Sequence, residues 1–128
     1  MDSDDESIDL DALKAKAEGG DLESQYEMGW RHALGMEVDM DDEIAVPWLE
    51  KAAAAGHMLA QNNMGARYYT GDGVDRDLMK AYRFFFRAAN QGDRKAGKNL
   101  DAVAKQLSEG DLESLRSEMG EAKFEATD

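Results

Sequence analysis

The apolar and polar positions of this chain repeat together at an offset of 36 residues. Residues 20–29 (GDLESQYEMG) align with residues 56–65 (GHMLAQNNMG), and the small pair Ala52-Ala53 recurs as Ala88-Ala89. A fixed period of roughly 30 to 40 residues without insertions is typical of stacked helix pairs, in which each unit buries its apolar face only against its neighbours. The pattern therefore predicts an all-α solenoid of helix hairpins, with about seven helices and no strand.

The register also predicts how the chain is divided. Residues 1–6 are acidic and are expected to form a disordered tail. We expect a single domain over residues 7–126, made of a capping helix at 7–19, repeats at 20–55 and 56–91, and a degenerate third repeat with a C-terminal capping helix at 92–126. The first helix is expected to start at Ile8, with Ser7 or Asp5 as its cap. Near the C-terminus we expect one helix from Arg94 to Leu107 and a last helix from Asp111 to Ala126.

Small residues recur where helices must approach closely. Gly29 and Gly65 occupy equivalent positions in mid-helix, where a larger side chain would push the paired helices apart. Gly56 and Gly92 follow the second helix of each repeat, where a left-handed backbone conformation favours glycine. The residues expected to face the core from the first helices are Ser24, Met28, Arg31 and His32 in repeat one, and Ala60, Met64, Arg67 and Tyr68 in repeat two.

Two features mark the start of the second helices. Asp41 and Asp77 stand at equivalent positions and suit helix N-caps. Pro47 falls near the sixth position of the second helix in repeat one, where repeat two has Arg83. Because proline lacks a backbone N–H, we expect Pro47 either to kink this helix or to delay its start past Val46.

Residues 60–77 (AQNNMGARYYTGDGVDRD), continued by Lys80-Ala81 and by residues 88–92 (AANQG), resemble a Sel-1-like repeat, a relative of the tetratricopeptide repeat. The resemblance covers about residues 17–105 and is strongest in repeat two. It implies a right-handed superhelix whose first helices line a concave face. It also implies a role in binding other proteins as an adaptor or scaffold, frequently in bacteria.

The charge narrows the choice of partner. Fifteen basic and 28 acidic residues give a formal net charge of −13. Such a chain would repel nucleic-acid phosphates and an anionic membrane surface, so neither is an expected partner. The charge favours either solubility alone or a basic protein partner. Cysteine is absent and the N-terminus resembles no targeting segment, which fits a cytoplasmic protein.

The sequence offers no set of residues for chemistry. His32 and His57 are not at equivalent repeat positions and lack spaced carboxylate partners. The acids around Asp39 and Asp75 lack the residue order of a calcium loop and are better explained as helix caps and solvated loops. No nucleophile, base and acid can be grouped by spacing. We therefore expect no catalytic, metal or cofactor site, and no enzymatic activity.

One face of the first helices has the composition of an interaction surface. In repeat one, the side opposite the core carries aromatic and aliphatic residues between acids, as an interaction hot spot does. The predicted partner-binding residues are Glu23, Tyr26, Glu27, Trp30, Leu34, Leu59, Asn62, Asn63 and Ala66. The alternatives are that the terminal helices or a second subunit cover this face, or that Trp30 folds back onto the core.

The sequence thus predicts a non-enzymatic module that holds a peptide or protein, basic in character, in the concave face of the superhelix. We expect a monomer or a weak homodimer. The alternative is an immunity or inhibitor protein that neutralises a basic bacterial toxin by masking its active site, which small size and acidic charge would suit.

Overall fold

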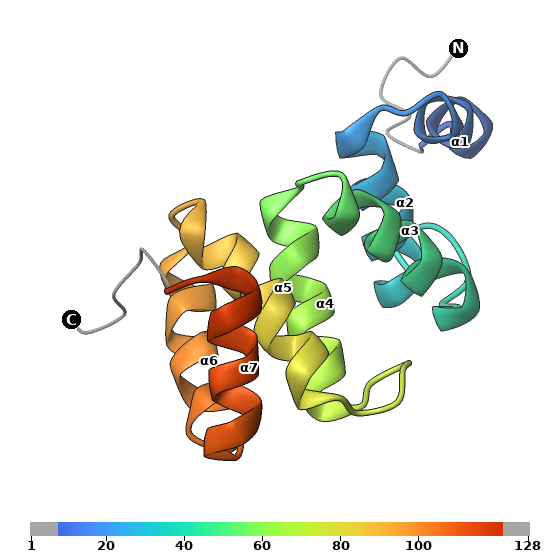
Figure 1. The fold of residues 1–128 in the computed structure, drawn as a ribbon. Coiled ribbons are helices and arrows are strands. Elements are labelled where there is room, and N and C mark those ends of the chain that lie inside the picture. The colour runs from blue at the N-terminus through green and yellow to red at the C-terminus, as the bar shows by residue number, and fades with distance from the viewer. Residues whose placement is uncertain (1–7, 122–128) are drawn as a thin grey trace, which may run out of the picture.

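The computed structural model describes residues 8–121, which contain seven helices and no strand (Figure 1). The expected acidic tail lies outside the described residues. Each of the first five helices packs against the next, and α7 packs against α5, so the helices form an elongated stack. The helices are α1 (Leu10–Glu18), α2 (Leu22–Leu34), α3 (Asp42–Ala54), α4 (Met58–Thr70), α5 (Leu78–Asn90), α6 (Arg94–Ala104) and α7 (Glu109–Met119).

The first helix of every repeat begins in the same way. Asp21, His57 and Asp93 lie 36 residues apart, and the side chain of each accepts a hydrogen bond from the backbone N–H three residues later. Each of these N-caps satisfies one of the N–H groups that a helix start leaves without a partner. The three first helices α2, α4 and α6 are therefore started by one recurring device, with a histidine in the middle position.

The second helices α3 and α5 begin with the caps expected from the sequence. Asp41 and Asp77 are the N-caps, and each side chain accepts a backbone N–H of the first turn. The backbone N–H of each cap donates to a carbonyl near the end of the preceding helix, that of His32 or Tyr68, at 2.8 Å in both repeats. The loop inside each hairpin is thereby closed in the same geometry.

A glutamine ties each repeat to the one before it. Gln25 Nε2 donates to the carbonyl of Ala17 at 3.1 Å, and Gln61 Nε2 donates to the carbonyl of Ala53 at the same distance. Both glutamines are buried. Because a buried amide without a partner is costly, these bonds fix the spacing between one hairpin and the next.

The closest approach of two helices lies at the mid-helix glycines. A Cβ built on Gly29 would lie 2.5 Å from side-chain atoms of Leu49, and one built on Gly65 would lie 2.7 Å from the ring of Phe85. Leu49 and Phe85 are 0% and 1% exposed. Each large side chain therefore sits directly over the backbone of a glycine, which confirms the close approach predicted from the repeat.

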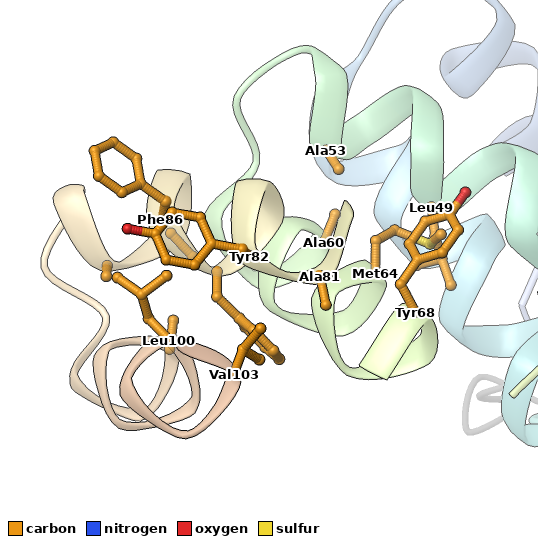
Figure 2. Close-up of a cluster of buried hydrophobic side chains, with 14 of the residues drawn as sticks. Leu49, Ala53, Ala60, Met64, Tyr68, Ala81, Tyr82, Phe86, Leu100 and Val103 are labelled. Carbon is orange, nitrogen blue, oxygen red and sulfur yellow. The ribbon is translucent and has the colours of Figure 1, made fainter. Parts of the chain in front are cut away.

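Most of the buried hydrophobic side chains form one cluster that extends from α3 to α7. Figure 2 shows Leu49, Met64 and Tyr68 at the α3–α4 junction, and Leu100 and Val103 at the other end of the same cluster. The residues expected to face the core from α2 and α4 are buried, apart from Arg31, which is mostly buried beside the loop. Gly56 and Gly92 have φ values of 105° and 104°, which confirms the left-handed turns after α3 and α5.

Helix α7 closes the C-terminal end. Leu115 of α7 is fully buried, and Tyr82 and Phe86 of α5 are 3% and 5% exposed. At the rim, the guanidinium of Arg83 donates two hydrogen bonds to the carboxylate of Glu118, at 2.8 and 3.1 Å. The last helix of the described residues thus packs on α5.

Three expected helix boundaries are wrong. Asp9 caps α1, so this helix begins at Leu10 rather than Ile8, and the expected caps Ser7 and Asp5 lie outside the described residues. Helix α6 ends at Ala104, three residues before Leu107. Ser108 caps α7, which begins at Glu109 and ends at Met119 instead of running from Asp111 to Ala126, because Gly120 turns out of the helix with φ 86°.

Pro47 does not delay the start of its helix. Helix α3 begins at Asp42 and continues through Pro47, whose side chain is exposed. The proline removes one i to i−4 hydrogen bond, that to the carbonyl of Glu43, on the outer side of the helix. The proline is therefore accommodated within α3.

We predict that Gly65→Ala destabilises the fold. The added methyl group would overlap the ring of Phe85, and overpacking of a core costs about 1–3 kcal/mol. The gain in helix propensity offsets at most ~1 kcal/mol of that. Urea unfolding should show a lower midpoint than that of the wild type.

Gly110→Ala is the matched control. Gly110 lies within α7, and a Cβ there would meet no atom within 4 Å. This variant should be unchanged or more stable by up to ~1 kcal/mol. Equal effects of the two substitutions would contradict the close approach at Gly65.

Candidate interaction surface

The first helices α2, α4 and α6 present a set of equivalent outward positions. Leu34 and Leu59 are 63% and 49% exposed, and the side chain of Glu23 is 80% exposed. Ala66 is also exposed, whereas five predicted residues are half-buried: Tyr26, Glu27, Trp30, Asn62 and Asn63. The predicted partner-binding residues thus lie on the surfaces of α2 and α4, with different degrees of access to solvent.

Trp30 is only partly covered. The guanidinium carbon of Arg31 lies 4.7 Å from the centre of the indole ring, so one side of the tryptophan is occupied by a cation. Arg31 is held there by Glu27, whose carboxylate accepts from Nε at 2.7 Å, and by the carbonyl of Met36 at 3.2 Å. The half-buried indole remains available for contact on its uncovered part.

Tyr26 is partly used inside the protein. Its ring stacks on that of His57 with 4.4 Å between centroids and 22° between planes, and it packs against the core. Burial, and secondarily the nearby carboxylate of Glu23, raise the pKa of Tyr26. Tyr26 therefore stabilises the junction between the two repeats, a role that the sequence pattern did not predict.

His57 joins this junction through both ring nitrogens. Nδ1 accepts the backbone N–H of Ala60 as the cap of α4, and Nε2 contacts the carboxylate of Glu23. Because a backbone N–H can only donate, Nδ1 carries no proton and Nε2 donates to Glu23. The ring is 8% exposed. The histidine is thus a structural cap and stacking partner; its alignment with Asp21 and Asp93 is the sequence signal for the cap.

The middle of the surface is polar and partly tied to the loop. Asn63 Oδ1 accepts from Nε of Arg67 at 3.0 Å, as Glu27 accepts from Arg31 in repeat one. Arg67 is buried and also donates to the carbonyl of Asp72. Asn63 therefore positions an arginine that supports the loop, while its neighbour Leu59 stays exposed.

The charge of the surface changes along the stack. The positions of Glu23 and Tyr26 in α2 are taken in α6 by Lys95 and Lys98, both exposed. The α2 end of the surface is therefore acidic and the α6 end is basic. The repeats keep their buried contacts while this face varies.

Among residues 8–121, no group of three or more histidine, cysteine, aspartate or glutamate side chains is placed to hold a metal ion. Within the same described range, no helix is both long and apolar enough to span a bilayer.

The fold is an all-α helical repeat solenoid built of tandem hairpins. The Sel1 repeat matches the chain twice, over residues 22–57 and 59–93, and these two matches cover more than half of it. The chain belongs to the Sel1-repeat family. A comparison with curated proteins finds no match.

Solved structures that share the fold include the following two. A protective antigen present in uropathogenic Escherichia coli strains, described as displaying an SLR fold, is 30% identical with a TM-score of 0.72. That match covers 89% of this chain and 26% of the antigen, so the chain spans about a quarter of its length. A Sel1 repeat protein from Oxalobacter formigenes is 28% identical with a TM-score of 0.67, covering 85% of this chain and 98% of the other. A Sel1-repeat fold suggests a protein–protein interaction module.

We predict that His57→Ala destabilises the junction between the repeats. The variant loses the helix cap, worth about 1 kcal/mol, and the ring stacking with Tyr26, worth about 0.5–1.5 kcal/mol. Denaturant unfolding should measure the sum of these losses.

His57→Asn separates the two contributions, because asparagine caps helices well and cannot stack as an imidazole does. Its stability should lie between those of the wild type and His57→Ala. If both variants were as stable as the wild type, neither the cap nor the stacking of His57 would stabilise the junction.

Proposed function

We propose that this protein binds a segment of another protein along the outward face of the first helices α2, α4 and α6. The observation that supports the proposal best is the exposure of Leu34 and Leu59, at 63% and 49%, on a face whose acidic residues include Glu23. Aliphatic side chains within a polar rim are the composition of a binding surface. The half-buried indole of Trp30 lies on the same helix as Leu34, one turn before it.

The charge of the face indicates the character of the bound segment. Glu23 and Glu27 lie at the α2 end, and the whole chain has a net charge of −13. A basic segment would be attracted to this end, and complementary charge mainly raises the association rate and selects the partner. Lys95 and Lys98 at the α6 end would repel it, so the charge gradient would set the direction in which the segment lies.

Binding at this face requires no change in the core. The buried glutamines and the glycine contacts lie between helices and do not involve Trp30, Leu34 or Leu59. Other residues of the face do have contacts within the protein: Tyr26 and Glu23 with His57, Glu27 with Arg31, and Asn63 with Arg67. We therefore assign Trp30, Leu34 and Leu59 as the contact residues. Glu23 and Glu27 would attract the basic segment.

The proposal predicts that Trp30 senses a basic ligand. Trp48→Phe, which introduces the residue of repeat two, leaves Trp30 as the only tryptophan. Titration with an extended decapeptide of alternating lysine and leucine should shift its fluorescence emission. In the same background, Leu34→Ala with Leu59→Ala should weaken binding at least tenfold, because the anchoring aliphatic groups are removed.

Two controls make the test specific. A decapeptide of alternating glutamate and leucine should not bind, and Ser114→Ala with Ser117→Ala, on the exposed part of α7, should not change affinity. A Trp30 emission that stays constant throughout the titration, or that responds equally to the acidic peptide, would count against the proposed surface.

A further inference from the structure

The segment from the end of α2 to the start of α3 carries a concentration of exposed apolar side chains. Five large apolar side chains are exposed in the described residues, and four of them lie between residues 34 and 44. Besides Leu34, these are Met36, Met40 and Ile44, which are 48%, 70% and 39% exposed. We call Met36, Met40 and Ile44 the loop patch.

The second repeat shows that the fold does not require this patch. The residues equivalent to Met36, Met40 and Ile44 are Asp72, Arg76 and Lys80. The two loops are closed by the same hydrogen bonds, from Asp41 N–H to His32 and from Asp77 N–H to Tyr68, both at 2.8 Å. Polar side chains therefore serve equally well at these positions, and the apolar residues of repeat one need an explanation outside folding.

The patch borders an open depression of about 650 Å³. Ile44 lines it together with Leu10 of α1 and Val38 of the loop, both half-buried, so apolar groups from three segments meet there. Gly35 also lines the depression, and a Cβ on Gly35 would lie 3.4 Å from Cβ of Met40, so Met40 is the neighbour of one lining residue. Exposed methionines in the same loop as an apolar depression suit an apolar helix face, because methionine adapts to the shape of its partner.

The surroundings of the patch are acidic. Residues 36–50 contain six acidic residues and no lysine or arginine, whereas the equivalent residues 72–86 contain three of each. Asp39 lines the depression and is exposed, and Glu43 is exposed in the first turn of α3. The local charge is therefore −6 in repeat one and 0 in repeat two. Repeat one thus has both the apolar side chains and the acidic surroundings, and repeat two has neither.

We propose that the loop patch binds an amphipathic helix of another protein, with an apolar face flanked by basic residues. Apolar side chains of that helix would contact Met36, Met40 and Ile44, and its lysines or arginines would face Asp39 and Glu43. A second copy of this chain fits poorly, because two acidic rims would be brought together and each chain carries a charge of −13. This surface is separate from the first-helix face, although Leu34 lies beside both.

The test uses an 18-residue amphipathic helical peptide of leucine and lysine, with its leucine–glutamate counterpart as control. Methyl-labelled methionine NMR should show shifts for Met36 and Met40 on addition of the basic peptide, and none for Met64, which is fully buried. The triple variant Met36→Asp, Met40→Arg and Ile44→Lys introduces the residues of repeat two, so it should fold. It should bind the basic peptide at least tenfold more weakly.

Ser114→Lys is the control for charge. It changes the net charge by the same +1 as the triple variant and leaves the loop intact, so its affinity for the basic peptide should remain that of the wild type. Three results would each overturn the proposal. The triple variant could bind the basic peptide as tightly as the wild type, the wild type could bind the acidic peptide, or light scattering could show a wild-type dimer that the triple variant abolishes. The response of Trp30 to the extended basic peptide should survive in the triple variant, so failure here is distinguishable from failure at the first-helix face.

Discussion

The structure depends on how closely two helices can approach within a hairpin. At Gly29 and Gly65 a large side chain of the partner helix lies against the glycine backbone, nearer than any Cβ would allow. This contact sets the distance between the helices of each hairpin. Because it recurs every 36 residues with the buried glutamines and the helix caps, the same geometry is transmitted from one hairpin to the next.

A repeat with this internal structure separates stability from recognition. The recurring contacts lie between helices, so the outward side chains can differ between repeats without disturbing the stack. The differences are where function is expected. Lysines replace Glu23 and Tyr26 along the first helices, and repeat one replaces the polar loop side chains of repeat two with Met36, Met40 and Ile44. The same scaffold can thus present two surfaces of different chemistry.

The 36-residue register was enough to predict the helix count, the core-facing residues and the glycine contacts, because these belong to every repeat. Features that occur once were not predictable in the same way. Asp9 caps the first helix although Ser7 and Asp5 were equally plausible caps by residue type. The stacking of Tyr26 on His57 joins residues 31 apart and depends on a histidine replacing the aspartate found in the other repeats. Partial burial of Trp30 likewise follows from the position of Arg31.

A double-mutant cycle between positions 65 and 85 tests the central packing contact most directly. Phe85→Ala alone leaves a cavity and should cost about 3–5 kcal/mol. With Phe85 shortened, the methyl group of Gly65→Ala enters vacated space, so the two changes together should cost less than their sum by more than about 1 kcal/mol. Simple addition of the two unfolding free energies would show that the glycine does not set the helix spacing.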